Sequence, residues 1–275
     1  GTSLPAAPSR SVRPGFGNSI VPQDGVALAV LSSGHAADVN DANPGFASFI
    51  GANMGTTSTF PAAWLAANGG PLPNAPDCPP PVGDVAFDPV MLNLRIRVPT
   101  NASSFSLSSY FFSAEYPEYV CSAFNDFFVV LLDSTWSGDP ANPVDKNHAT
   151  YAAPNGAVYP VGVNLAYGNT GLFNQCVNGA SGCAQGTAGT VSSCSGTGEL
   201  SGTGFDTASP FACDANSLEG GGTGWLETSG NVVSGEIIEV HIAIWDTSDE
   251  ILDSLALVDN FRWSVGISEP GTVVD

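Results

Sequence analysis

Residues 110–133, YFFSAEYPEYVCSAFNDFFVVLLD, place a short acidic loop between an aromatic segment and an apolar one. Both flanking segments have the β-branched and aromatic composition of strands, so the loop is held at both ends by rigid structure. The loop itself carries Glu115, Glu118, Asn125 and Asp126. Carboxylate and amide side chains at this density predict a binding or structural site at the end of a strand pair.

Strand patterns recur along the rest of the chain. In residues 91–98 (MLNLRIRV), apolar and polar side chains alternate as in a half-buried strand. Residues 236–246 (EIIEVHIAIWD) show the strongest strand pattern. We also expect strands over 25–32, 104–112, 127–132, 158–165 and 255–265, and a short helix over 61–68. Strands at this spacing with few helices between them predict an all-β fold, namely an antiparallel jelly-roll-type β-sandwich with long disulfide-stapled loops.

The domain organisation follows from composition. Residues 23–268 are interpreted as a single β-sandwich domain that contains a Gly/Ser/Cys-rich insertion over 170–224. Residues 1–22 form a Pro/Ser-rich N-terminal arm, which we interpret as a loose leader; the alternative is an arm that packs on this domain or on a neighbour. Residues 269–275 are interpreted as a polar C-terminal tail.

The net charge of the chain restricts the kinds of partner that it can bind. The chain has 26 acidic residues against six lysines and arginines, for a net charge of −20. This argues against nucleic acid and anionic lipid as partners, because both are bound by basic patches. It favours either cation binding or simple solubility. No apolar run is long enough to span a bilayer, so direct membrane insertion is not expected.

Six cysteines and the absence of any CxxC pair argue against a zinc ribbon or a redox motif and favour disulfides formed in an oxidising compartment. We therefore expect a secreted or extracellular protein at the cell surface. Its first residue is Gly1, which is compatible with a removed export signal. We expect two local pairs in the insertion and one long-range pair: Cys176–Cys183, Cys194–Cys213 and Cys78–Cys121.

A second acidic loop, residues 246–253, also lies between two expected strands. A sandwich gathers its loops at its two ends, so the two acidic loops can converge. Converging carboxylates repel each other unless they are neutralised. The alternatives are an ion pair with Arg95 or Arg262, protons shared between carboxylates, or Ca²⁺. With so few bases, a structural calcium ion is the preferred interpretation.

Sugar chemistry is a weaker alternative. Glu115 and Glu118, with Tyr116 and Tyr119 beside them, supply the residue types of a glycoside hydrolase site, but nothing selects that function over a structural loop. Tryptophans that would serve as a sugar-stacking platform are more typical of a sandwich core: Trp136, Trp225, Trp245 and Trp263.

Other catalytic chemistry has little support. His35, His148 and His241 have no flanking nucleophile signature, and the chain has no GxSxG elbow. Lys146, the single lysine, is a candidate for an intramolecular isopeptide bond with an Asn or Asp, but one lysine in a loop is thin evidence. We therefore expect a protein that is not an enzyme.

Two strings, FFSAEYPEYVCSAFNDFFVVLLDS and GTGWLETSGNVVSGEIIEVHIAIWDTSDEILDSLALVDNFRWS, together resemble the choice-of-anchor L domain, a bacterial surface module. The form with Cys121 inside the motif resembles myxobacterial-type members, and the resemblance covers about residues 75–265. It implies an exported cell-surface or matrix β-sandwich with no established activity. The candidate calcium ligands that lie on the two motifs are Glu115, Glu118, Asn125, Asp126, Asp246, Asp253 and Asp259.

The expected function is therefore adhesion or surface and matrix assembly by a calcium-stabilised, non-enzymatic protein. One alternative is a self-assembling filament or surface-layer subunit whose arm, residues 1–22, pairs with an open sheet edge of a neighbour. Another is a carbohydrate-binding module or weak glycoside hydrolase. The corresponding partners are a second copy of the chain and a surface glycan.

Overall fold

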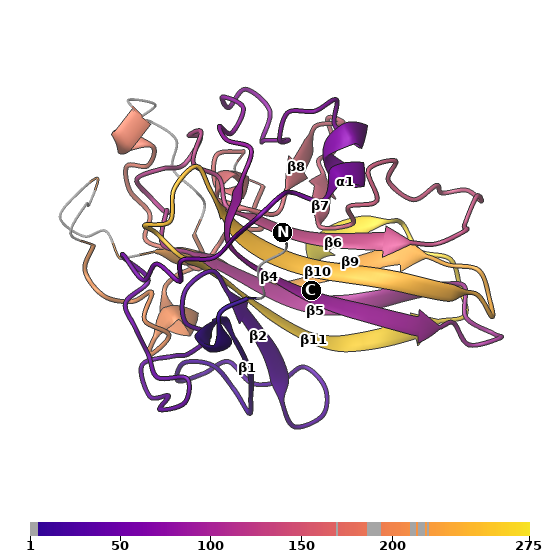
Figure 1. The fold of residues 1–275 in the computed structure, drawn as a ribbon, viewed down its shortest axis with the longest axis horizontal. Coiled ribbons are helices and arrows are strands. Elements are labelled where there is room, and N and C mark those ends of the chain that lie inside the picture. Colours follow the sequence, from indigo (N-terminus) through magenta and orange to yellow (C-terminus); the bar gives the residue numbers. More distant parts are fainter. Residues whose placement is uncertain (1–4, 169, 186–193, 210–212, 214–217, 219) are drawn as a thin grey trace.

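Two antiparallel sheets packed face to face form the body of the protein (Figure 1), as seen in a computed structural model that describes residues 5–168, 170–185, 194–209, 213, 218 and 220–275. The larger sheet has the order β1-β2-β11-β5-β9-β12 and the smaller one β3-β4-β10-β6. A separate hairpin pairs β7 with β8.

The strands of the larger sheet are β1 (Arg10–Arg13), β2 (Leu28–Ser32), β11 (Ser254–Ser264), β5 (Ser104–Ser113), β9 (Gly221–Asn231) and β12 (Gly271–Val274). Those of the smaller sheet are β3 (Thr57–Ser58), β4 (Ala86–Arg97), β10 (Ile237–Thr247) and β6 (Phe127–Asp133). The hairpin is β7 (Thr150–Ala152) and β8 (Val158–Pro160). The helices are short: α1 (Ala62–Ala67) and single 3-10 turns at Ala7–Ser9, Val163–Leu165, Cys183–Gln185 and Gly198–Leu200.

Successive long strands lie in alternate sheets. The chain passes from β2 in the larger sheet to β4 in the smaller one, returns to β5, crosses to β6, and continues through β9, β10 and β11 in the same alternation. This crossing pattern is that of a jelly roll, so the predicted fold class is confirmed. Because every crossing occurs at an end of the sandwich, the connecting loops collect there (Figure 1).

Several strands are apolar on both faces because both faces are covered. β6 is buried along Phe127–Leu132, with Phe128 and Val130 in the core between the sheets and Phe127 and Val129 in a second cluster beside α1. Trp64 of α1 packs edge-on against Phe127 at 5.5 Å between ring centroids. The loops around the sheets therefore form part of the core, which fixes their positions.

The expected strands over 25–32, 104–112, 127–132, 236–246 and 255–265 are present, as is the helix over 61–68. The expected strand over 158–165 is shorter: β8 ends at Pro160 and a 3-10 turn follows. The strand expected over 91–98 lies within β4, and five strands were not predicted: β1, β3, β7, β9 and β12. β9 begins inside the 170–224 insertion, and the expected C-terminal tail contributes β12, which pairs with β9 through Gly271↔Ser229.

The N-terminal arm is not a loose leader over its described residues, 5–22. β1 pairs with β2 of the same chain, and Phe16 and Ile20 are buried in a cluster on the outer face of the larger sheet. Arg13 adds an ion pair with Asp41 at 2.7 Å. The arm thus belongs to the domain, because its two apolar side chains have a surface to cover.

All six cysteines form disulfides. The disulfide Cys78–Cys121 was predicted. The two predicted local pairs are wrong, since the bonds are Cys176–Cys194 and Cys183–Cys213. The reason lies in backbone pairing: the Cys176 N–H donates to the carbonyl of Gly196 at 2.9 Å, which brings two distant parts of the insertion together. Among the described residues, no helix is long and apolar enough to cross a membrane. Three disulfides in this fold fit an extracellular protein.

Candidate functional site

The two acidic loops predicted to converge do meet at one end of the sandwich. The loop between β5 and β6, residues 114–126, and the loop between β10 and β11, residues 248–253, are joined by hydrogen bonds. The Ala114 N–H donates to the Asp253 carbonyl at 3.0 Å, and the Ser248 hydroxyl donates to the Ala123 carbonyl at 3.0 Å. The loop crossings of the jelly roll therefore bring together carboxylates from two motifs far apart in sequence.

Four of these carboxylates form a buried group, which we call the acidic cluster: Glu115, Asp126, Asp246 and Asp253. Their exposed fractions are 2%, 1%, 1% and 0%. Asp246 lies at the centre, because its carboxylate interacts electrostatically with each of the other three. Asp249 is half-buried and adds a fifth negative group that acts on Glu115 and Asp126. Like charges are thus crowded where little water can screen them.

Hydrogen bonds satisfy only part of the cluster. Asp126 accepts the Thr247 N–H at 3.0 Å and the Ser254 hydroxyl at 2.7 Å. Glu115 Oε2, in contrast, is buried with no hydrogen-bond partner, and neither carboxylate oxygen of Asp246 makes a hydrogen bond of normal geometry. Buried acceptors without donors are costly, so these oxygens point to a proton or cation that the protein side chains do not supply.

The pKa values of the cluster are raised. Burial is the main cause for Glu115, whose pKa is further raised by Asp126 and Asp249. Burial and then the charges of Asp126 and Asp253 raise the pKa of Asp246 well above its usual range. Burial raises the pKa of Asp126 to about 7, against the opposing effect of its hydrogen bonds. The cluster therefore resists carrying its full negative charge unless a positive charge joins it.

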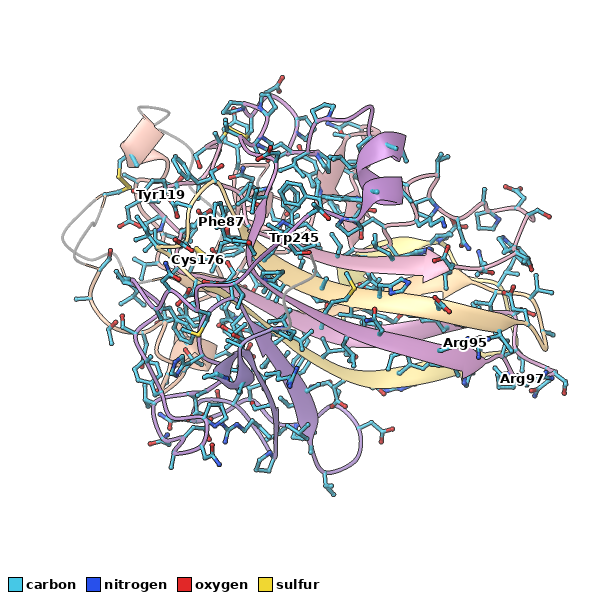
Figure 2. The ribbon with its side chains drawn as sticks, in the orientation of Figure 1. Phe87, Arg95, Arg97, Tyr119, Cys176 and Trp245 are labelled. Carbon is cyan, nitrogen blue, oxygen red and sulfur yellow. A yellow bond between two sulfur atoms is a disulfide. The ribbon has the colours of Figure 1, made fainter. Side chains whose placement is uncertain are left out.

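No base in the described part of the chain forms an ion pair with the cluster. Arg95 pairs with Glu239 at 3.5 Å, and Arg262 donates to Asn260 through its Nε. Figure 2 shows Arg95 and Arg97 at the end of the sandwich opposite Tyr119. None of the ion pairs found among the described residues includes a cluster carboxylate. The ion-pair alternative is therefore wrong, and shared protons or a bound cation remain.

A small cavity gives the cluster access from outside. It has a volume of about 150 Å³ and is lined by Glu115, Tyr119, Asp249, Ile251 and Leu252. That space exceeds what a single water molecule needs. The cavity therefore has room for water beside the carboxylates of Glu115 and Asp249.

The donor set suits calcium better than it suits a softer metal. All of the cluster's side-chain donors are carboxylate oxygens, which are the ligands of Ca²⁺, and the site has no imidazole or free thiolate. Within the described residues, no three cluster carboxylates place an oxygen within 4.8 Å of one another. A shared ion therefore requires the carboxylates to rotate inward. Calcium tolerates such adjustment, since its coordination number and geometry are flexible and it accepts backbone carbonyls and waters.

Three predicted ligands do not belong to the cluster. Glu118 is buried but accepts the Ser209 hydroxyl at 2.9 Å. Asn125 uses its side-chain oxygen to accept the Asn164 N–H at 3.2 Å. Asp259 accepts the backbone N–H of Gln23 at 2.6 Å and of Asp24 at 3.1 Å, and so anchors the loop before β2. These three are structural acceptors whose hydrogen bonds could not be seen in the sequence.

Sequence reasoning also missed the loop after β2. A Cβ on Gly34 would lie 2.2 Å from Asp253 Oδ2, so only glycine fits against that carboxylate. The Ser33 hydroxyl accepts the Ser254 N–H at 2.9 Å and thereby fixes the residue next to Asp253. The signal was present as a Ser-Ser-Gly run at the end of a strand, since a glycine there marks close backbone approach.

The structure does not assemble the residues proposed for sugar binding. Tyr116 is buried, and its hydroxyl donates to the Val177 carbonyl at 3.0 Å. Trp245 is buried against Trp64 at 5.6 Å between ring centroids. Trp136 donates its Nε1 proton to the Pro140 carbonyl at 3.0 Å. These side chains brace loops or fill the core, as the alternative interpretation of the aromatics held.

Comparison of the chain with protein-family models, with curated proteins and with solved structures finds no match. The resemblance to the choice-of-anchor L domain consequently stays a prediction.

Proposed function

We propose that this protein is an exported, non-enzymatic β-sandwich that acts at the cell surface in adhesion or matrix assembly, and that Ca²⁺ in the acidic cluster holds its two acidic loops together. In this proposal Asp246 is the central ligand, with Asp126, Asp253 and Glu115 around it. The ion would connect the end of β5 and the start of β6 to the β10–β11 loop.

The observation that carries the proposal is the unsatisfied state of Asp246. Its two oxygens are buried without a normal hydrogen bond, it is surrounded by three other carboxylates, and none of the ion pairs among the described residues includes it. A divalent cation removes the repulsion and supplies the missing partner in one step, whereas a shared proton neutralises only one carboxylate. At neutral pH the cation is thus the more effective stabiliser.

Thermal unfolding with excess CaCl₂ and with EGTA tests the calcium site. A ligand that binds only the folded state stabilises it by about 2.7 kcal/mol at a hundred times its Kd, so we expect a clear rise in Tm with calcium. Asp246→Asn should abolish the rise. Asp259→Asn is the matched control, because it neutralises a carboxylate on the same motif but outside the cluster, and it should keep the rise. Equal Tm values for the wild-type protein in calcium and in EGTA would sink the calcium site.

The surface assignment is supported by three observations of different kinds. The disulfides fit an extracellular protein, the net charge of −20 keeps the surface soluble and hydrated, and the two sequence motifs resemble a bacterial surface module. Antibody labelling of intact cells, compared with permeabilised cells, checks the assignment. Signal that appears only after permeabilisation would place the protein inside the cell and contradict it.

The two alternatives lose the observations that motivated them. The arm of a filament subunit would have to leave its own sheet, where β1 already pairs with β2. The sugar platform would need Tyr116, which is buried. The calcium-stabilised surface protein is therefore the function that these contacts support best.

A further inference from the structure

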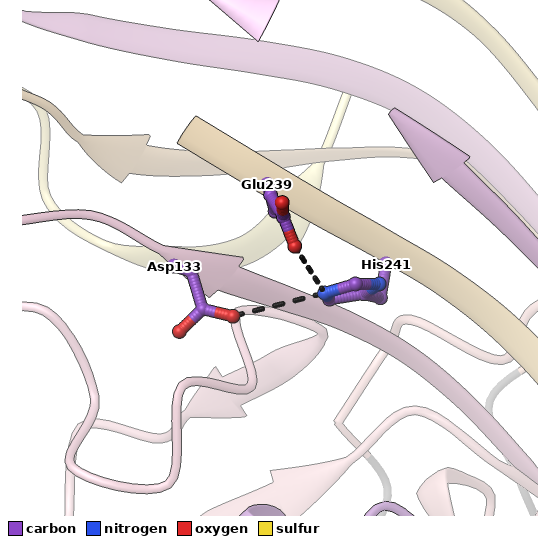
Figure 3. A group of neighbouring side chains, drawn as sticks. All are labelled: Asp133, Glu239 and His241. Carbon is purple, nitrogen blue, oxygen red and sulfur yellow. Dashed lines mark ion pairs between the residues drawn. The ribbon is translucent and has the colours of Figure 1, made fainter. Parts of the chain in front are cut away.

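A second group of metal-ligand side chains lies on the outer face of the smaller sheet, away from the acidic cluster. Glu239 and His241 are two residues apart on β10, so their side chains share one face. Asp133 at the end of β6 is the direct cross-strand partner of Glu239. Figure 3 shows the three side chains turned toward one another.

The atoms that face each other are all potential ligands. His241 Nε2 lies 3.7 Å from Asp133 Oδ2 and 3.8 Å from Glu239 Oε2. These three atoms lie within 4.8 Å of one another, and among the described residues this is the one group of three or more His, Cys, Asp or Glu side chains that meets this condition. The spacing is wider than a hydrogen bond and leaves room for an ion at the centre.

Every side chain of the group is held by its other polar atom. Asp133 Oδ1 pairs with Lys146, and Glu239 Oε1 pairs with Arg95 at 3.5 Å. His241 Nδ1 contacts the Asn93 side-chain oxygen at 2.5 Å. A carbonyl oxygen only accepts, so Nδ1 donates to Asn93, and this contact turns Nε2 toward the two carboxylates.

We propose that Asp133, Glu239 and His241 form a binding site for a divalent transition metal, foremost Zn²⁺. Three acceptors converge with their remaining atoms already occupied, and Asn93 orients the imidazole as outer partners of metal-bound histidines do. One nitrogen and two carboxylate oxygens suit zinc better than Ca²⁺ or Mg²⁺, which prefer oxygen alone.

The supporting framework is rigid. On the inner face of β10, Val240 and Ile242 are buried in the core between the sheets. The register that places Asp133 beside Glu239 is part of a continuous ladder between the two strands. Three protein ligands leave one tetrahedral position for water or for a donor from another molecule. A surface depression of about 490 Å³ lies beside two of the three side chains, since Glu239 and His241 line it together with Asn93.

Lys146 has a place in this arrangement. Its contact with Asp133 is an ion pair between side chains that are 46% and 45% exposed. Lys146 therefore serves as a positioning residue that leaves Asp133 Oδ2 free to face His241.

Zinc titration of the full chain by isothermal calorimetry tests the proposal, with the protein saturated with CaCl₂ and again without it so that the acidic cluster cannot account for the result. We expect one zinc per chain, with affinity reduced at least tenfold in His241→Ala. His35→Gln is the control, because it removes a histidine from another part of the molecule. Asn93→Leu should weaken zinc 10- to 100-fold by removing the partner that orients the ring.

Nitrogen-15 NMR of the histidine rings gives a readout that a structural role would not move. Zinc should shift the Nε2 resonance of His241 and leave the ring resonances of His35 and His148 unchanged. Equal zinc affinity in the wild-type protein and His241→Ala would overturn the proposal. So would a His241 Nε2 resonance that stays constant at 1 mM zinc, about the upper limit for a specific weak site.

Discussion

Asp88 on β4 and Asp246 on β10 are both 1% exposed and lie on neighbouring strands, where Asp246 pairs with Phe87. Asp88 accepts the N–H of Met54 at 2.8 Å, the N–H of Thr56 at 2.7 Å and the Thr56 hydroxyl at 3.0 Å. Asp246 accepts no normal hydrogen bond and faces three other carboxylates. Two equally buried acids thus have opposite surroundings.

The difference shows that donors, and not burial alone, separate a structural acid from a candidate binding site. Asp88 has three hydrogen-bond donors in place of the water it lost, and in return it fixes the segment before β3. Asp246 lost the same water, and the repulsion of Asp126, Asp253 and Glu115 outweighs the favourable effect of the Ser33 hydroxyl. An added cation would relieve the repulsion around Asp246, whereas Asp88 already has its hydrogen-bond donors.

The largest test of this contrast is Asp88→Ala. Removing a charged acceptor deprives the two backbone N–H groups and the Thr56 hydroxyl of their partner, and we expect a loss of about 3–5 kcal/mol in the free energy of unfolding. Urea unfolding in calcium buffer measures it. The rise in Tm with calcium should persist in this variant, and its disappearance would show that Asp88 contributes to the ion site.

The buried base His148 should also be disfavoured in its charged form, which for a histidine is the protonated form. His148 is buried, its Nδ1 proton is donated to the Ser229 carbonyl at 2.8 Å, and Nε2 has no hydrogen-bond partner. Burial lowers its pKa from 6.5 to about 4. As the pH falls, the unfolded chain is therefore protonated at His148 before the folded chain is. The contribution of His148 to the free energy of unfolding is fully present above pH 6.5 and is lost as the pH falls toward 4. The loss amounts to roughly 3 kcal/mol.

The variant His148→Gln isolates that contribution, because glutamine does not titrate. Denaturant unfolding of both proteins between pH 7 and pH 4 should show a smaller loss of stability in the variant. Parallel pH profiles would contradict the assignment of the proton to His148.

Sequence patterns predicted the sandwich because alternation and apolar runs depend on burial, and burial also decides which strands form. β10 and β6 carry these patterns strongly, and both are where they were expected. β9 was missed because its Gly and Thr residues resemble the loop before it, and its burial comes from neighbours such as Phe173, which lies against Gly221. The two wrong disulfides have the same origin, since the pairing depends on backbone contacts within the insertion.

The candidate site was predictable only in part. The convergence of two acidic loops follows from the jelly-roll crossings, so Glu115, Asp126, Asp246 and Asp253 could be grouped from the sequence. Which acids already have donors could not be known, because the donors come from distant segments: Ser209 for Glu118, and the N–H of Gln23 for Asp259. The cluster on β6 and β10 was missed because only the strand register places Asp133 beside Glu239.

The smallest effect is expected for Asp246→Asn. In EGTA, Asp246→Asn removes one charge from the cluster and should stabilise the protein at pH 8, on the order of 1 kcal/mol, which is typical of a single substitution. The folded pKa of Asp246 is raised by burial and by its neighbours, so its destabilising effect grows as the pH rises above the ordinary value and vanishes as the pH falls toward it. The stability advantage of the variant should therefore shrink between pH 8 and pH 4.

Saturating calcium should reverse the order of stability of the two proteins at pH 8, because the wild-type carboxylate then binds the ion and the amide binds it less well. A variant that is less stable than the wild-type protein in EGTA at pH 8 would mean that Asp246 has donors after all, and the contrast with Asp88 would fail.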